Sequence, residues 1–225
     1  MKFKKVIENQ RSIYDAQIKD HGDSPETTHN QLVEIQNLRF ERLLSNLDIS
    51  SKASIHDIGC GICDMYHYLN KQKSNLVYSG TDIVPAMKEL VNSKYPELVY
   101  HIRDIIEDDI EETYDYVVLS GMFNLPGDID HKTWKEFTRN MILSMYKMAK
   151  KGIAFNFLTQ KADFYNPKMF YESMEDVSDF CLKKMSRHLY IDHAYPLYEF
   201  TFTVLRPEVV KERYSHKTFI KYFKL

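Results

Sequence analysis

Short apolar runs alternate with longer segments of helical periodicity between residues 54 and 158. The apolar runs predict strands at 54–59, 76–83, 98–104, 114–121 and 152–158. The segments between them predict helices at 63–72, 84–94 and 131–149. Strands and helices in regular alternation are typical of a mostly parallel sheet with helices on both faces.

The alternation ends after residue 182. Two strand-like segments, "KMSRHLYID" (184–192) and "YEFTFTVLR" (198–206), follow each other with only a short loop between them. Neighbouring strands on a short loop pair in antiparallel fashion. The predicted fold is therefore α/β, a Rossmann-like seven-stranded, mostly parallel sheet with a C-terminal antiparallel hairpin, which differs from the usual dinucleotide-binding fold.

The first fifty residues predict two helices, at 3–20 and 30–46, with Gly22 and Pro25 in the loop between them. The chain contains no internal repeat and no Pro-, Gly- or Ser-rich linker, so we expect one domain over 1–225. Within it, we predict an N-terminal helical lid at 1–50 and a cofactor-binding core at 51–158. A second lid and the closing hairpin follow at 159–225.

Composition favours a small-molecule partner. Thirty Lys and Arg residues against 32 Asp and Glu residues leave a formal net charge of −2. Such a chain has no overall basic field for a nucleic acid or an anionic membrane. It also has no signal-peptide pattern and no run near the roughly 20 apolar residues of a membrane helix. We expect a cytoplasmic protein, either a monomer or a homodimer.

Candidate ligand-binding residues follow the first four predicted strands. In an open α/β sheet, ligands bind outside the carboxyl ends of the strands. The residues at these ends are Asp57, Gly59, Cys60, Gly61, Asp82, Ile83, Asp104, Ile105, Ser120 and Gly121. The glycines allow backbone to approach a ligand closely. Asp82 is placed to accept the hydroxyls of a ribose, and Asp104 to accept the amine of adenine.

The residue at position 64 favours S-adenosylmethionine over a dinucleotide as the predicted cofactor. A dinucleotide-binding turn has a small third residue where this chain has Asp64. The carboxylates of Asp64 and nearby Asp57 would repel a pyrophosphate. They are compatible with the positive sulfonium of S-adenosylmethionine, so electrostatics favour the methyl donor.

Four motifs resemble those of class I S-adenosylmethionine-dependent methyltransferases, in the same order and at similar distances. They are "HDIGCGICD", "YSGTDI", "HIRDII" and "YDYVVLSGMFN". Together with "HGDSP", "QNLRF", "AFNFLT" and "DHAYPLYEF", they resemble a bacterial group acting on small molecules or surface sugars. The resemblance covers roughly residues 30 to 205. It implies that Gly59 and Gly61 line the methionine part of S-adenosylmethionine, Asp82 the ribose, and Asp104 with Ile105 the adenine.

The remaining roles follow from this resemblance for Arg39 and the lid segment, and from position after the later strands for the acceptor-side residues. Arg39 is the candidate for the cofactor carboxylate, because a guanidinium pairs both carboxylate oxygens. Residues 160–182 fall where such enzymes have an acceptor lid. The candidate substrate-binding residues are Tyr14, Met122, Phe123, Asn124, Asn156, Tyr195 and Tyr198. We expect O-methylation of a small polar metabolite or sugar, with His193 as the general base because histidine titrates near neutral pH.

Two alternatives are open. Cys60 and Cys63 form a C-x-x-C at a predicted helix start, which also suits a thiol oxidoreductase. The chain would otherwise be a non-catalytic nucleotide-binding module. A zinc site is not expected, because Cys181 is the only other thiol. Three cysteines also make a disulfide framework unexpected.

Overall fold

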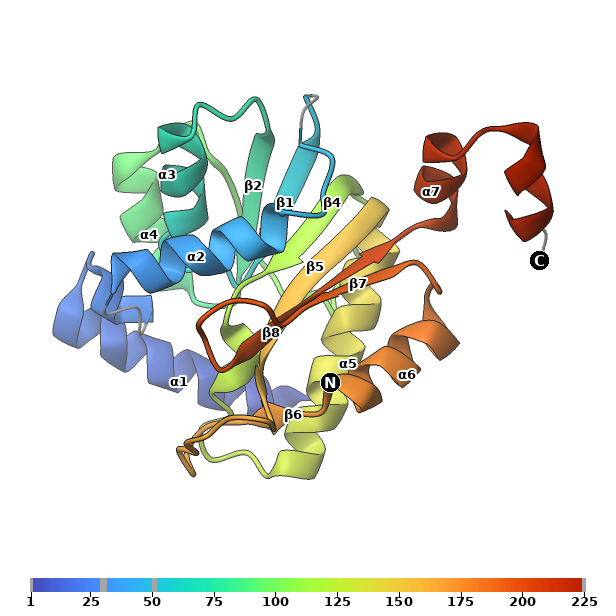
Figure 1. The fold of residues 1–225 in the computed structure, drawn as a ribbon. Coiled ribbons are helices and arrows are strands. Elements are labelled where there is room, and N and C mark those ends of the chain that lie inside the picture. The colour runs from blue at the N-terminus through green and yellow to red at the C-terminus, as the bar shows by residue number, and fades with distance from the viewer. Residues whose placement is uncertain (1, 29–31, 50–51, 224–225) are drawn as a thin grey trace.

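The computed structural model describes residues 2–28, 32–49 and 52–223 (Figure 1). The strands that the sequence predicts are all present, within three residues of their expected bounds, except that the strand predicted at 184–192 begins five residues later than expected. The strands are β1 Ser54–Ile58, β2 Val77–Asp82, β3 Val99–Ile102, β4 Tyr114–Leu119, β5 Ala149–Thr159, β6 Tyr171–Glu172, β7 Leu189–Asp192 and β8 Glu199–Leu205. Of these, only the two-residue β6 is not predicted. It adds an eighth strand to the seven expected.

The sheet has the order β3-β2-β1-β4-β5-β8-β7, and β6 pairs with the end of β5. Strands β1 to β5 are parallel to one another, whereas β8 is antiparallel to both β5 and β7. The predicted mostly parallel sheet with an antiparallel C-terminal pair is therefore confirmed. Since β1 to β5 run in the same direction, their carboxyl ends meet at one edge.

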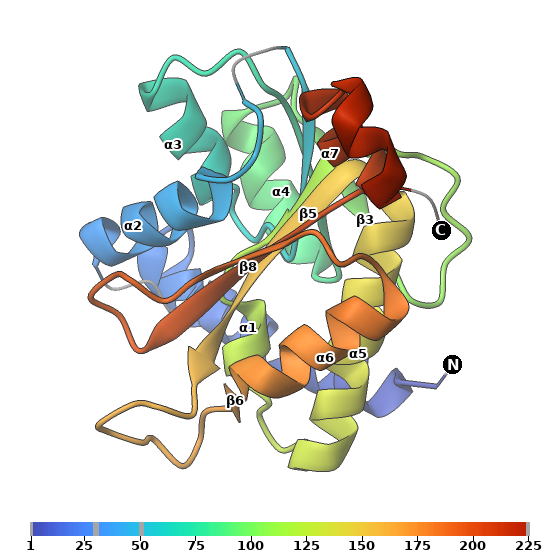
Figure 2. The same ribbon diagram turned by 45° about the vertical axis from the view of Figure 1, so that its right-hand side comes forward.

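Helices cover both faces of the sheet (Figure 2). On one face lie α2 Val33–Leu44, α3 Asp64–Lys71 and α4 Pro85–Lys94; on the other lie α5 His131–Met148 and α6 Met174–Lys184. Residues 30 and 31, where the sequence predicts the start of the second helix, lie outside the described residues. The helix α6 occupies part of the segment 160–182.

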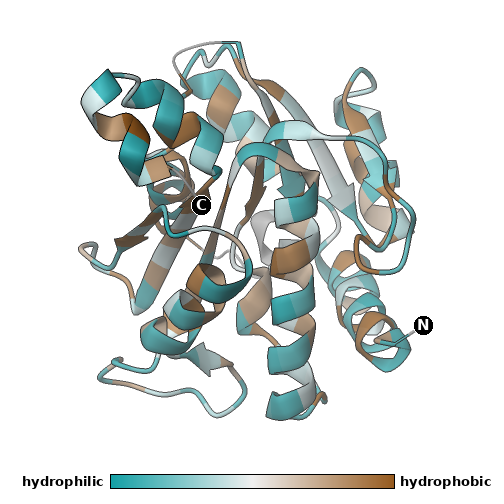
Figure 3. Ribbon diagram, turned by 90° about the vertical axis from the view of Figure 1, so that its right-hand side faces the viewer, coloured by the Kyte–Doolittle hydropathy of each residue, from teal (hydrophilic) through white to brown (hydrophobic). Residues whose placement is uncertain are grey.

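The alternation of side chains along β4 explains the two layers. Val117 and Leu119 pack with α5 on one face, while Tyr116 and Val118 pack with α2 and α3 on the other. All four are fully buried, as expected for a central parallel strand. Figure 3 shows the central strands mainly brown and the outward surfaces of the helices mainly teal.

The N-terminal helix α1 Lys4–His21 crosses the carboxyl edge of the parallel strands (Figure 1). Two side chains hold it to loops at that edge. Arg11 Nε donates to the Ile83 carbonyl at 2.9 Å, and Gln10 Nε2 donates to the Leu125 carbonyl at 3.1 Å. A short 3₁₀ helix, η1 Pro25–Thr28, follows α1. These elements close the edge where the sequence places the cofactor.

The remaining elements lie after β4 and at the C-terminal end. A 3₁₀ turn, η2 Met122–Asn124, follows β4. Beyond β8, no helix was expected from the sequence, but the structure has α7 Pro207–Arg213 and η3 Lys217–Phe223, neither of which buries a residue. Figure 1 shows both projecting from the amino end of β5. Within the described residues, no helix has the length and apolarity needed to cross a membrane.

Candidate cofactor and substrate site

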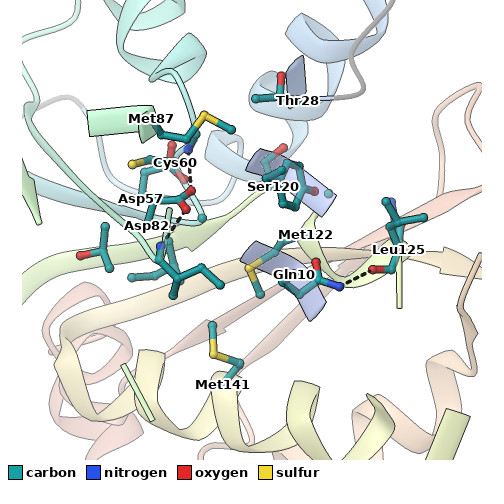
Figure 4. Close-up of a pocket in the computed structure, with 18 of the residues that line it drawn as sticks. Gln10, Thr28, Asp57, Cys60, Asp82, Met87, Ser120, Met122, Leu125 and Met141 are labelled. Carbon is teal, nitrogen blue, oxygen red and sulfur yellow. Dashed lines mark hydrogen bonds between the residues drawn. The ribbon is translucent and has the colours of Figure 1, made fainter. Parts of the chain in front are cut away.

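A cavity of about 250 Å³ opens at the carboxyl edge of β1 to β4, beneath α1 and α2. Most of the residues predicted to bind cofactor or substrate line it. They are Tyr14, Arg39, Asp57, Gly59, Cys60, Gly61, Asp82, Ile83, Asp104, Ile105, Ser120, Gly121, Met122 and Asn124. Figure 4 shows Asp57, Cys60 and Asp82 on one side of the cavity, and Met122, Met141 and Gln10 on another. The individual roles of these residues remain predictions.

The turn after β1 brings backbone close to the cavity. Gly59 and Gly61 both have positive φ, 67° and 52°. A Cβ atom on Gly59 would lie 2.9 Å from Met122 Sδ, and one on Gly61 would lie 2.8 Å from Thr28 Cγ2. Because other residues are strained in this backbone region and a Cβ here would displace the Met122 or Thr28 side chain, both positions favour glycine.

Asp82, at the end of β2, holds this turn in place. Its Oδ2 accepts a hydrogen bond from Gly61 N at 3.0 Å, and its Oδ1 accepts from Ile83 N at 2.7 Å and Val84 N at 3.0 Å. Burial raises the pKa of Asp82, and the three backbone donors oppose that rise. The carboxylate is therefore both a structural acceptor and an acidic wall of the cavity.

Asp57 is a second buried carboxyl group at the cavity. Its Oδ2 accepts from the Tyr78 hydroxyl at 2.8 Å. Burial, with repulsion from Asp82 and Asp64, raises its pKa to about 7, against the effect of the Tyr78 hydrogen bond. Asp64 also lines the cavity, and Gln36 Nε2 donates to its Oδ2 at 2.7 Å. Three acidic groups thus face one region, which suits a cationic ligand and disfavours a pyrophosphate.

Asp104, after β3, has a buried carboxylate oxygen that no described protein group pairs with. Its Oδ1 accepts from Ile106 N at 2.9 Å, whereas its buried Oδ2 has no hydrogen-bond partner among the described residues. Burial raises the pKa of Asp104, and Asp108 and Glu107 raise it further. A buried acceptor without a donor costs free energy unless a ligand supplies the donor. The amine of adenine is a donor of this kind.

At the opposite end of the cavity, a network of hydrogen bonds links α2, β8, β5 and the turn after β4. Arg39, on α2, donates from Nε and Nη2 to the carboxylate of Glu199, with distances of 2.9 and 2.6 Å to Oε1. Asn156 Nδ2 donates to Glu199 Oε2 at 2.7 Å, and Asn156 Oδ1 accepts from Gly121 N at 2.7 Å. Glu199 was not among the predicted site residues, because a single glutamate at a strand start carries no motif.

Five predicted site residues do not line the cavity: Phe123, Asn156, His193, Tyr195 and Tyr198. Phe123 is fully buried and stacks on Phe157, with ring centroids 4.7 Å apart, so it belongs to the core. His193 is exposed in the loop between β7 and β8. The structure does not bring it to the cavity, and no histidine is among the described lining residues.

The two tyrosines lie in the same loop as His193. The hydroxyl of Tyr195 hydrogen-bonds with Thr201 Oγ1 at 2.9 Å, and that of Tyr198 donates to Asp163 Oδ2 at 3.5 Å. Both therefore contact neighbouring protein groups outside the cavity. Ile7 and Gln10 also line the cavity and were not predicted from the sequence. Their spacing with Tyr14 (7, 10, 14) is that of one helix face and is the signal from which they can be found.

The cysteine pair has the wrong surroundings for thiol chemistry. Cys60 and Cys63 are both buried and reduced, and Cys63 is fully inaccessible. Burial raises the pKa of Cys60, as do hydrogen bonding and repulsion from Cys63. A reactive thiol is instead exposed and has a lowered pKa. Among the described residues, no group of three or more His, Cys, Asp or Glu side chains is arranged to hold a metal ion.

Comparison with known structures identifies the fold. The magnesium protoporphyrin IX methyltransferase of Synechocystis, solved with bound S-adenosylhomocysteine, superposes with a TM-score of 0.63 at 13% identity. The match covers 92% of this chain and all of that one. The N-methyltransferase NodS of Bradyrhizobium japonicum, also with S-adenosylhomocysteine, gives a TM-score of 0.60 at 14% identity, over 88% and 99% of the two chains.

The fold is that of the class I S-adenosylmethionine-dependent methyltransferases. Sequence similarity agrees with it: a Mycobacterium tuberculosis protein named as a putative methyltransferase is 28% identical over 153 residues. That match covers 67% of this chain and 92% of the relative. No protein-family profile matches the chain. The comparisons support the predicted methyltransferase family, an enzyme of this kind, and S-adenosylmethionine as its cofactor.

Proposed function

We propose that this methyltransferase transfers the methyl group of S-adenosylmethionine to an oxygen atom of a small molecule, with a polar metabolite or sugar as the first candidate. The observation that carries the proposal is the unpartnered Oδ2 of Asp104 in the same cavity as Asp82 and the Gly59 turn. Together they offer an acceptor for adenine, a carboxylate for ribose and bare backbone for the methionine part.

The charge of the cavity supports the methyl donor over a dinucleotide. Asp57, Asp64 and Asp82 all face it. Bound S-adenosylmethionine supplies a methyl group on a cationic sulfur, and these carboxylates stabilise that positive charge. The residues present therefore fit the cofactor.

The chain contributes the positioning of the acceptor to the reaction. Arg11 and Gln10 hold the helix α1 over the carboxyl edge, where it would cover the cofactor and the acceptor. Holding the acceptor oxygen in line with the methyl carbon makes the displacement effectively unimolecular. With S-adenosylmethionine bound, the acceptor oxygen would take its methyl group, S-adenosylhomocysteine would be the leaving group, and the hydroxyl proton would be released to solvent. His193 as a general base stays a prediction that needs its loop to approach the cavity.

Calorimetric titration with S-adenosylhomocysteine tests cofactor binding. We expect the protein to bind this product, and Asp82→Ala to weaken the binding at least tenfold, because the substitution frees the Gly61 turn as well as removing the ribose acceptor. A protein that binds no S-adenosylhomocysteine would rule out the proposal.

Transfer of a radiolabelled methyl group to a metabolite extract tests catalysis itself. Labelled product is expected from the wild-type protein. Cofactor binding without any labelled product, over a broad set of extracts, would instead indicate a non-catalytic binding module.

A further inference from the structure

Glu199 is a buried carboxylate behind the wall of the cavity. Its side chain is 2% exposed, and it does not itself line the cavity. It accepts hydrogen bonds from Arg39 and Asn156, which lie on α2 and β5. Among these groups, Arg39 lines the cavity directly.

The antiparallel pairing of β5 and β8 explains why Asn156 meets Glu199. Asn156 is opposite Thr201, so Glu199, two residues earlier on β8, is its diagonal neighbour on the same face of the sheet. The start of the antiparallel strand thus places one carboxylate at the carboxyl end of β5. Arg39 reaches it from α2, which packs on β5 and β8.

The contact continues into the turn after β4. The amide of Asn156 has one orientation that satisfies both neighbours: Nδ2 toward the Glu199 carboxylate and Oδ1 toward Gly121 N. Rotation of the amide by half a turn would face its oxygen to the carboxylate. Glu199 therefore fixes the orientation of Asn156, and Asn156 fixes the Ser120–Gly121 backbone, both residues of which line the cavity.

The sheet order indicates which part of the cofactor this wall meets. Asp104 follows β3 and Gly121 follows β4, with β2 and β1 between these strands. Three strand spacings separate them, about 14 Å. If adenine lies at Asp104 and ribose at Asp82, the amino-acid end of the cofactor lies over β1 and β4, beside Gly121 and Arg39.

We propose that Glu199 is a positioning residue that holds Arg39 and the Ser120–Gly121 turn against the amino-acid end of S-adenosylmethionine. The proposal rests on the proposed function, since it assumes that this cofactor occupies the cavity. Glu199 acts only through Arg39 and Asn156, because it does not reach the cavity surface.

Binding of two different ligands distinguishes a positioning role of Glu199 from a general effect on protein stability. S-adenosylhomocysteine has the amino-acid part, whereas 5′-methylthioadenosine keeps adenine and ribose and lacks it. For Glu199→Gln, we expect binding of S-adenosylhomocysteine to weaken at least tenfold in calorimetry, and binding of 5′-methylthioadenosine to stay within twofold. The introduced amide has one donor group where the carboxylate accepted, so it cannot serve both Arg39 and Asn156.

Glu172 supplies a matched control. It is a second buried glutamate, 1% exposed, that pairs with two cations, Lys135 at 3.2 Å and Arg139 at 2.8 Å. None of these three residues lines the cavity. Glu172→Gln is expected to change thermal stability as much as Glu199→Gln does, and to leave the binding of both ligands unchanged.

A second variant covers the case in which Glu199→Gln does not fold. Glu199→Asp keeps the charge but is one methylene shorter, so it cannot reach both Arg39 and Asn156. This variant should also weaken the binding of S-adenosylhomocysteine and leave that of 5′-methylthioadenosine unchanged. Unchanged binding of S-adenosylhomocysteine, or equal weakening of both ligands, would overturn the positioning role and leave the proposed function standing. A wild-type protein that binds neither ligand would overturn both proposals.

Discussion

The two ends of the cavity are built in different ways. At the β1–β3 end, aspartates bond to backbone groups in their own or adjacent strand-end turns, as Asp82 does with Ile83, Val84 and Gly61. At the β4–β8 end, Arg39 reaches a carboxylate 160 residues away in sequence. The first end is specified by local turns and contains a buried carboxylate oxygen without a described protein partner. The second is a buried ion pair that also joins α2 to the sheet.

This difference predicts that the β4–β8 end contributes more to stability, and Arg39→Ala is the sharpest way to test it. The substitution leaves the Glu199 carboxylate buried without its guanidinium. Loss of one partner of a buried pair typically costs about 3–5 kcal/mol. Arg39 is 21% exposed, so water partly replaces it, and we expect a loss near the lower figure.

Equilibrium unfolding in urea measures this loss. Lys183→Met is the control, because its pair with Asp179 joins two exposed side chains and contributes little. Equal unfolding midpoints for Arg39→Ala and wild type would contradict the comparison.

At the β1–β3 end, Asp104→Asn should weaken binding with little effect on stability. The substitution puts an amide where a buried carboxylate oxygen has no protein partner. Losing a hydrogen bond from the adenine amine costs about 1–3 kcal/mol, or roughly tenfold in affinity. Unlike Glu199→Gln, this variant should weaken S-adenosylhomocysteine and 5′-methylthioadenosine equally.

The same calorimetric titrations measure this effect. Asp109→Asn is the control, since Asp109 lies exposed in the same acidic loop and does not line the cavity. Weaker binding of S-adenosylhomocysteine alone would show that adenine does not lie at Asp104. The cofactor would then bind with its amino-acid end at β3 instead of at β4.

The contrast between the two ends also explains what the sequence could predict. The site residues of the β1–β3 end could be predicted from the sequence because each acidic residue or glycine follows its own strand. The periodicity of apolar residues locates the ends of those strands. Asp82 and Asp104 were placed in this way, and both line the cavity. The seven main strands were predicted for the same reason, whereas β6 is two residues long and has no periodicity.

The contacts of the β4–β8 end could not be predicted from the sequence, because they depend on the pairing register of strands that are distant in the chain. Arg39 was predicted as a cofactor residue, but its partner is set by the pairing of Leu158 with Glu199 across β5 and β8. A shift of one residue in that register would turn Glu199 to the other face. Similarly, Phe123 was expected at the substrate because it follows β4, yet η2 turns it into the core.

Asp57, at the β1–β3 end, should make the free energy of unfolding depend on pH. The pKa of Asp57 is raised to about 7 in the folded protein, against about 4 in an unfolded chain. Between these values, the folded protein binds a proton that the unfolded chain does not, so stability falls as pH rises from about 4 to 7. Between pH 6 and 7, we expect this group to lower the free energy of unfolding by about 1 kcal/mol.

Urea unfolding at a series of pH values, on wild type and Asp57→Asn, isolates this contribution. The groups that face Asp57 are Tyr78, which donates to it, and Asp82 and Asp64, which repel it. The difference between the two proteins should change with pH below about 7 and level off above it. A difference that is constant with pH would show that Asp57 is ionised throughout.

The smallest effect is expected at the loop outside both ends. His193 is exposed and absent from the cavity lining, so His193→Ala should leave S-adenosylhomocysteine binding and the rate of methyl transfer within about twofold of wild type. The measurement is the pH profile of radiolabelled methyl transfer. His216→Ala, at another exposed histidine, is the control. A large loss of rate at His193 alone, with a changed pH profile, would show that the loop between β7 and β8 closes over the cavity during turnover. The β4–β8 end would then carry the general base as well as the buried pair, and the acceptor would lie under Tyr195 and Tyr198.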